Sequence, residues 1–384
     1  MRIQPFAWFA AALFSAAAVG AEPVTTDSYQ WLEDVTGDAA LDWVRARNAE
    51  SHEVLESDLA FAKLRADLRA ILDSDAKIPT VQKIGAHYYN FWKDSKNPRG
   101  LWRRTTLDEY RKAAPQWDVV LDLDALNAAE GENWVWHGAD CLRPDAVDAP
   151  YERCLISLSR GGADADVTRE FDLVKREWVK DGWFRPEAKG GLAWIDRDRV
   201  YVYTDFGPGS MTESGYPRIV KEWKRGTPMS EARVVYEGQA EDLYIAAGHD
   251  DTPGFERDFV QRAIAFYNDE LYLRSDDGTL MKIDAPNSAN KAVEREWLTL
   301  ELRDPWAVGG RTWPAGALLA IRFDEFLAGK RDFDMLFEPS ATTSLSGFDW
   351  TRNHLILNVL DDVKNRLFVL TPGADGWSRK PLDG

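Results

Sequence analysis

The amino-acid sequence predicts a mainly β protein, a β-propeller of about six blades preceded by a short helical segment. After Pro79, short runs rich in Val, Ile, Tyr and Trp alternate with clusters of Gly, Asp, Asn and Pro, which is typical of strands and turns. The runs fall into groups of four that repeat about every 45–55 residues, as propeller blades do. A pair of β-sandwiches would also contain many short strands, but the grouping in fours favours the propeller.

The strand runs can be assigned to blades one group at a time. The predicted groups are 81–84, 87–93, 101–105 and 119–123; then 134–136, 154–159, 168–173 and 177–179; then 192–195, 200–203, 219–223 and 234–236; then 243–247, 259–266, 270–274 and 280–283, with 297–300 beyond them; then 317–323 and 335–337; and finally 348–350, 355–359, 366–370 and 377–380. The fifth group is the least regular.

The segment before these strands is predicted to be helical from about Asp38 to Ser74. Asp38 is expected to cap a first helix that carries Leu41 and Val44. A second helix has apolar residues at i, i+3, i+7, i+10 and i+11, which form one stripe that something should cover. These residues are Phe61, Leu64, Leu68, Ile71 and Leu72.

The N-terminus has the layout of a secretory signal peptide. A basic Arg2 precedes an apolar run over residues 6–19, and Val19-Gly20-Ala21 offers small residues for cleavage after Ala21. The run is about 14 residues, short of the roughly 20 needed to span a bilayer, although an uncleaved anchor helix is the alternative. We therefore expect residues 1–21 to be a signal peptide, 22–76 a helical segment and 77–384 the propeller, in an exported protein, periplasmic or secreted, with no further contact with the membrane.

The net charge bears on the possible partners of the protein, and the cysteine content bears on whether it contains a disulfide. The formal net charge of −17 argues against nucleic acid as a partner, because phosphate backbones are repelled. The two cysteines, Cys141 and Cys154, form an even pair, which in an exported protein is compatible with a disulfide. Two unpaired, buried thiols are the alternative.

No motif in the sequence predicts catalysis, a metal site or a cofactor. The nucleophile elbow G-x-S-x-G is absent, and the string around Ser210 lacks its spacing. Adjacent residues such as His249, Asp250 and Asp251 rarely point at one ion, so a polar loop explains them better than a metal. The string Asp205-Phe206-Gly207 matches a kinase magnesium motif, but no other kinase motif accompanies it.

Two glycine-rich loops between predicted strands are candidates for binding. They cover residues 159–166 (SRGGADAD) and 207–218 (GPGSMTESGYPR). Functional loops are often long and glycine-rich because the scaffold supplies rigidity, but a solvated connection between strands is the simpler interpretation.

Several strings in the sequence resemble the prolyl oligopeptidase family of serine peptidases. They are YQWLED at 29–34, WVRARN at 43–48, RGLWRR at 99–104, LISLSRGGADAD at 155–166 and SMTESGYPRIVKEWKR at 210–225. The resemblance extends over nearly the whole chain that follows the signal peptide.

This resemblance implies an N-terminal helical segment, a seven-bladed propeller that admits only short peptides, and a C-terminal α/β-hydrolase domain with a Ser-Asp-His triad. The hydrolase domain is expected to be absent here, so no catalytic residue is assigned, and the chain alone is expected to be inactive. The implied partners are short peptides and the missing hydrolase domain. The alternative is a stand-alone propeller that binds peptides or a protein without cleaving them.

Overall fold

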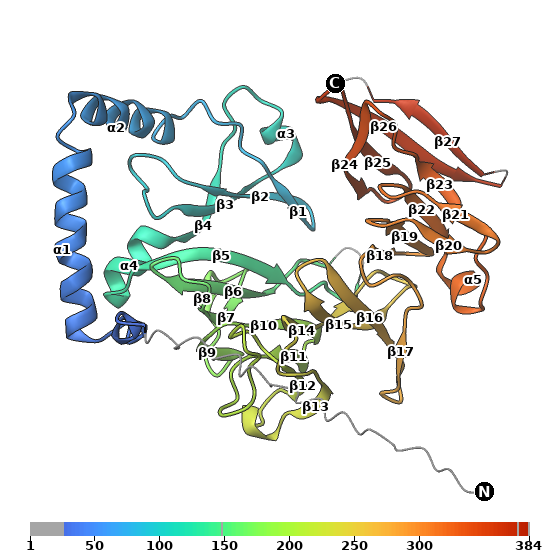
Figure 1. Cartoon of the computed structure of the whole chain (residues 1–384), viewed down its shortest axis with the longest axis horizontal. Coiled ribbons are helices and arrows are strands. Elements are labelled where there is room, and N and C mark those ends of the chain that lie inside the picture. The colour runs from blue at the N-terminus through green and yellow to red at the C-terminus, as the bar shows by residue number, and fades with distance from the viewer. Residues whose placement is uncertain (1–26, 147–148, 375, 383–384) are drawn as a thin grey trace, which may run out of the picture. The chain divides into compact units, whose positions relative to one another are not determined.

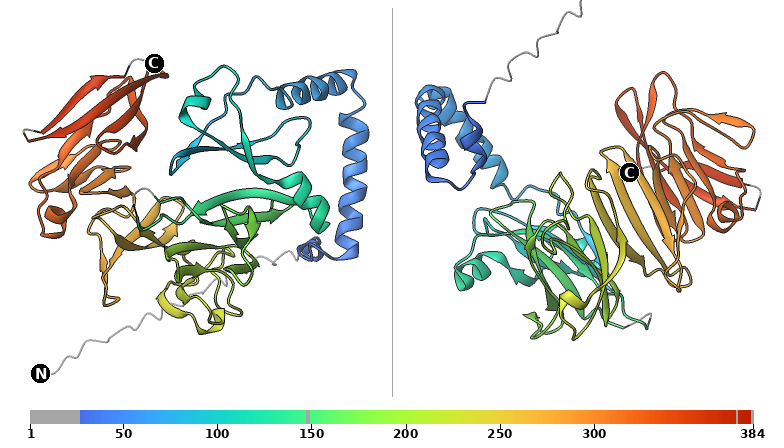
Figure 2. Two further views of the ribbon diagram at one scale, coloured as in Figure 1. Left: turned by 180° about the vertical axis from the view of Figure 1, so that it is seen from behind. Right: turned by 60° about the horizontal axis from the view of Figure 1, so that its bottom comes forward.

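The computed structural model describes residues 27–146, 149–374 and 376–382 (Figures 1 and 2). The predicted signal peptide, residues 1–21, lies outside the described residues. The chain forms two compact units whose boundary follows Ser74.

The first unit is helical, as predicted, although one predicted cap is wrong. It contains the 3₁₀ helix η1 (Gln30–Glu33) and the helices α1 (Asp38–Leu55) and α2 (Leu59–Leu72). The N-cap of α1 is Gly37, and Asp38 is the first helical residue, because carboxylates are also favoured in the first turn by the helix dipole. In α2, Asp58 is the N-cap, and its carboxylate accepts a hydrogen bond of 2.8 Å from the backbone N–H of Ala60.

The second unit is a β-propeller of six sheets, which follow one another around a centre (Figure 1). Sheet 1 contains β1 (Gln82–Ile84), β2 (His87–Trp92), β3 (Leu101–Thr105) and β4 (Asp118–Asp122); sheet 2 contains β5 (Trp134–Cys141), β6 (Arg153–Arg160), β7 (Asp166–Asp172), β8 (Glu177–Trp178) and β9 (Phe184–Ala188); and sheet 3 contains β10 (Gly191–Asp196), β11 (Arg199–Tyr203), β12 (Ile219–Lys224) and β13 (Arg233–Glu237). Sheet 4 contains β14 (Tyr244–Asp250), β15 (Arg257–Ala265), β16 (Asn268–Arg274) and β17 (Leu280–Lys282); sheet 5 contains β18 (Asn290–Glu294), β19 (Trp297–Glu301), β22 (Leu318–Arg322) and β23 (Asp334–Phe337); and sheet 6 contains β24 (Thr343–Trp350), β25 (Leu355–Asp361), β26 (Lys364–Gly373) and β27 (Gly376–Pro381). The predicted grouping of strands in fours is confirmed, but the fifth group is completed by β18, which was not predicted, and by β19, and sheet 2 has a fifth strand, β9.

Short elements decorate the connections between these strands. A two-stranded hairpin, β20 (Trp306–Val308) and β21 (Arg311–Trp313), is inserted between β19 and β22. The remaining short helices are α3 (Leu107–Tyr110), α4 (Leu123–Glu130), α5 (Phe323–Leu327) and η2 (Met229–Glu231). No helix in the described ranges is both long and apolar enough to cross a membrane.

Apolar side chains between consecutive sheets form the core. The cluster between sheets 1 and 2 is rich in aromatic rings: Trp136 stacks on Phe91 at 5.1 Å and lies 5.3 Å from Trp102. Similar buried clusters join sheets 2 and 3, 3 and 4, 4 and 5, and 5 and 6. None of the clusters among the described residues joins sheet 6 to sheet 1.

The strand order gives the propeller two distinct faces. Each sheet is an antiparallel run of four main strands, so its first strand begins and its fourth strand ends on the same face. We call this the linker face, because the chain enters β1 and leaves β27 there. The connections between the second and third strands of each sheet, including residues 161–165 and 204–218, lie on the same face.

Candidate functional site

The structure brings the two glycine-rich loops together on the linker face. The hydroxyl of Tyr216 donates a hydrogen bond of 2.9 Å to the carboxylate of Asp164, across 52 residues of sequence. The ammonium of Lys189 lies 3.4 Å from Asp164 and 4.1 Å from the centre of the Tyr216 ring. The hydrogen bond from Tyr216, followed by that from Lys189, lowers the pKa of Asp164. The loops thus form one polar surface across sheets 2 and 3.

A buried ion pair anchors the base of the first loop. The guanidinium of Arg185, on β9, is fully buried and pairs with Asp166, the first residue of β7. It also donates a hydrogen bond of 2.9 Å to the carbonyl of Ala188, and Nδ1 of His137 lies 3.0 Å from Asp166. Burial lowers the pKa of Arg185, and the charge of Asp166 opposes that shift. The sequence pattern does not predict β9, so it gives no sign that Arg185 is buried in a sheet.

Ser210, the residue nearest to a nucleophile motif, has a structural role. Its side chain is buried, and its hydroxyl donates a hydrogen bond of 2.6 Å to the carbonyl of Gly207 and accepts one of 2.8 Å from the N–H of Phe206. In the described part of the chain, no histidine is bonded to this hydroxyl. A serine nucleophile needs a base within hydrogen-bond reach, so Ser210 lacks the required partner.

The residues His249, Asp250 and Asp251 point to three different partners. Nδ1 of His249 lies 3.2 Å from Asp258, Asp250 pairs with Arg257 at 3.0 Å, and Asp251 accepts a hydrogen bond of 2.9 Å from Arg143. Over residues 27–146, 149–374 and 376–382, the structure contains no group of three or more His, Cys, Asp or Glu that could hold a metal ion.

The His249–Asp258 pair is expected to make stability depend on pH. The hydrogen bond with Asp258 raises the pKa of His249 above 6.5. Burial alone would raise the pKa of Asp258, but hydrogen bonds from His249 and Tyr201 bring it below 3.8. Because the pKa of His249 is raised in the folded state, its stabilisation of the fold is complete below pH 6.5 and is lost as pH rises through the folded pKa. Because the pKa of Asp258 is lowered, its stabilisation is complete above pH 3.8 and is lost as pH falls through the folded pKa.

The contribution of the pair should therefore be largest between about pH 3.8 and 6.5. Urea unfolding of the wild type and of His249→Gln at pH 5, 6.5 and 8 tests this. The difference in unfolding free energy between the two proteins should shrink as pH rises. A difference that is constant from pH 5 to 8 would show that the histidine does not titrate in the expected direction.

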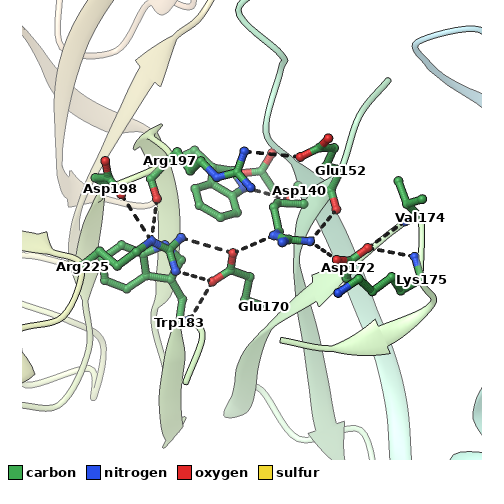
Figure 3. Close-up of polar contacts among 12 residues, drawn as sticks. Asp140, Glu152, Glu170, Asp172, Val174, Lys175, Trp183, Arg197, Asp198 and Arg225 are labelled. Atoms are coloured by element: carbon green, nitrogen blue, oxygen red, sulfur yellow. Dashed lines mark hydrogen bonds and ion pairs between the residues drawn. The ribbon is translucent and has the colours of Figure 1, made fainter. Parts of the chain in front are cut away.

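The opposite face carries a buried network of charges between sheets 2 and 3 (Figure 3). The carboxylate of Glu170, on β7, has 1% of its surface exposed and accepts hydrogen bonds of 2.9 and 3.2 Å from Arg225. It also accepts a hydrogen bond of 2.9 Å from the backbone N–H of Trp183, and Nε of Arg153 lies 3.6 Å away. Arg225 comes from the connection that follows β12, so the network joins two sheets that share no backbone hydrogen bonds.

A cavity of about 960 Å³ opens beside this network on the same face. Its walls include Arg143 from the first connection of sheet 2 and Arg197 from the first connection of sheet 3. His249, at the end of β14 in sheet 4, also lines it. The predicted cysteine pair lies at the base of the first of these connections. Cys141 and Cys154 are directly opposite each other on β5 and β6, and their sulfur atoms are bonded. Formation of this disulfide in the exported protein stays a prediction.

Taken together, the fold and its loops define a propeller domain with polar surfaces on both faces and no nucleophile–base pair around Ser210. The chain belongs to the prolyl oligopeptidase family. A family model described as "Prolyl oligopeptidase, N-terminal beta-propeller domain" matches residues 16–254.

Two curated relatives and the solved structures agree with this assignment. The chain is 34% identical to the uncharacterized peptidase y4nA of Sinorhizobium fredii and 28% identical to the uncharacterized peptidase RP174 of Rickettsia prowazekii, over 92% and 91% of its length. It spans only 49% and 50% of those relatives. A post-proline cleaving enzyme from Rickettsia typhi has 29% identity and a TM-score of 0.83, with 92% of this chain and 52% of that chain covered. Oligopeptidase B from Leishmania major, at 14% identity and a TM-score of 0.67, shares the fold over 93% of this chain and 49% of that chain.

Proposed function

We propose that this chain is the N-terminal propeller portion of an exported prolyl-oligopeptidase-like serine peptidase, which controls the access of short peptides to a catalytic domain. The observation that carries the proposal is the match to about half the length of proteins named as peptidases. The linker face supports it, because a domain that follows β27 would begin on the face where the loops containing Asp164 and Tyr216 meet.

The proposal assigns the chemistry of peptide hydrolysis to the catalytic domain. Hydrolysis needs groups positioned to stabilise charge in the transition state, together with an activated nucleophile. The polar side chains of the two loops are engaged in pairs such as Asp164–Tyr216 and Asp166–Arg185, which suit the positioning of a loop more than proton transfer.

The activity test compares the chain with a longer protein. Residues 22–384 should neither hydrolyse chromogenic short peptides nor react with a fluorophosphonate serine probe. The same residues fused to the C-terminal half of the Sinorhizobium fredii relative should do both and should cleave short peptides faster than long ones. Probe labelling of the chain alone would contradict the proposal, since it requires a nucleophile in this half.

A stand-alone binding propeller is the second candidate, and the cavity of about 960 Å³ favours it. Titration of the chain alone with a mixed library of short peptides separates the two functions. Tight binding by the chain alone, together with a fusion protein that is inactive, would favour the binding module.

Export is part of the proposal, and its support is the signal-like sequence before Glu22. Protein expressed in a host that exports it should begin at Glu22 when its N-terminus is sequenced. A mature protein that still begins at Met1 would contradict both export and cleavage after Ala21.

A further inference from the structure

An exposed aromatic pair lies at the tip of a tight turn on the linker face. Phe266 and Tyr267 form the whole connection between β15 and β16, and their exposed fractions are 81% and 55%. Turns are dominated by Gly, Pro, Asn, Asp and Ser, so two consecutive aromatic residues are unusual at a turn. Neither aromatic residue is buried in the sheet, so the core does not explain them.

A second turn on the same face carries an exposed valine in an unfavourable conformation. Asp362 and Val363 form the connection between β25 and β26, with φ of 46° and 58°. A β-branched residue is rarely found at positive φ, because that conformation is strained and costs free energy. Val363 is 89% exposed, so its side chain regains none of that energy by packing within the described chain.

The aromatic tip is held in place by the neighbouring sheet. The guanidinium of Arg303, which follows β19, stacks on the ring of Tyr267 at 3.7 Å. Cation–π contacts of this kind limit the freedom of both side chains. The tip is therefore pre-organised, which lowers the entropy lost when a partner binds it.

Because both turns are connections between second and third strands, they project from the same face, on sheets 4 and 6. The chain leaves β27 on this face, and it spans about half of its curated relatives. Protruding tips suit a broad protein surface better than a small peptide, which binds in concave sites.

We propose that Phe266, Tyr267 and Val363 are docking contacts for the catalytic domain of the longer peptidase. The inference rests on the proposed function and adds the residues that hold the two halves together. Each apolar tip would enter a depression of the catalytic domain, and burial of the aromatic pair would supply most of the contact energy.

The test uses the fusion of this chain to the C-terminal half of the Sinorhizobium fredii relative, with a specific protease site inserted after residue 384. After cleavage of that site, the two halves should co-elute in gel filtration. The double variant Phe266→Asp and Val363→Asp should weaken their association at least tenfold. The matched control is Val174→Asp: Val174 is 62% exposed and follows β7 on the opposite face, so this variant should leave association unchanged.

Two further outcomes bear on the proposal. Equal association of the two halves in the wild type and the double variant would overturn the docking proposal, even if the fusion cleaves peptides. A fusion that cleaves no peptide would count against the proposed function instead. Self-association of the chain alone that Phe266→Asp abolishes would identify a second copy as the occupant and also overturn it. In the chain alone, Val363→Gly should not lower the urea midpoint of unfolding, because glycine tolerates positive φ. A lower midpoint would show that Val363 stabilises the propeller itself and would overturn its role as a docking contact.

Discussion

Replacing Glu170 with alanine is expected to lower the unfolding free energy of the propeller by about 2–3 kcal/mol. The change would leave Arg225 and Arg153 without their shared carboxylate between sheets 2 and 3, and the N–H of Trp183 without its acceptor. Losing one partner of a buried ion pair costs about 3–5 kcal/mol. The lower value is expected here because the side chains of Arg225 and Arg153 are 27% and 19% exposed, so water screens part of their charge.

Urea unfolding followed by tryptophan fluorescence measures this effect, and Glu152→Ala is the matched control. Glu152 borders the same network and lies 3.3 Å from Arg197, but the two side chains are 48% and 59% exposed. Exposed pairs contribute about 0–1 kcal/mol, so the control should shift the midpoint little. Equal shifts of the midpoint for the two variants would show that the burial of Glu170 does not determine how much it contributes to the unfolding free energy.

Reduction of the Cys141–Cys154 bond is expected to lower the unfolding free energy by about 3 kcal/mol. The two residues are 13 apart in sequence, and a loop of this size restricts the unfolded chain by about that amount in the chain-entropy model. The bond also closes the connection that contributes Arg143 to the cavity wall. Urea midpoints of periplasmically produced protein, with and without reductant, measure the difference.

The control for this experiment is the double variant Cys141→Ala and Cys154→Ala, whose midpoint should not respond to reductant. Thiol titration of the denatured, unreduced wild type should find no free thiol. Two reactive thiols, or a wild-type midpoint that reductant does not change, would contradict the predicted disulfide.

The main strands could be predicted from sequence because each repeats the same local chemistry. Runs such as 200–203 and 355–359 are rich in β-branched residues and end at turn formers, which determine strand position without knowledge of the partner strand. Strand β9 could not be found in this way, because it contains Pro186 and charged residues and pairs only with β7. A proline within a short run argues against a strand, so tertiary pairing decided the outcome.

The loops were predicted as unusual, but their contact was not. Asp164 and Tyr216 meet only because sheets 2 and 3 are neighbours, which no local pattern reveals. The turn at Phe266 and Tyr267 is not predicted either. The sequence places Phe266 in the strand over 259–266, because phenylalanine favours strands, whereas β15 ends at Ala265. The turn formers Asn268 and Asp269 favour a turn two residues later than the one in the structure, where both lie in β16 and the turn residues are Phe266 and Tyr267.

Each sheet is made of consecutive strands and packs on its neighbours in sequence, so the six sheets of the described propeller are coupled in series, like the units of a repeat protein. In such arrays, stability is the sum of the intrinsic stability of each unit and the coupling between adjacent units. Sheets 1 and 6 each have one coupled neighbour in the clusters of the described residues, whereas sheets 2–5 have two. Thermal fraying should therefore begin at sheets 1 and 6, and sheets 2–5, which include sheet 2 with Glu170 and the cysteine pair, should lose their protection against hydrogen exchange later.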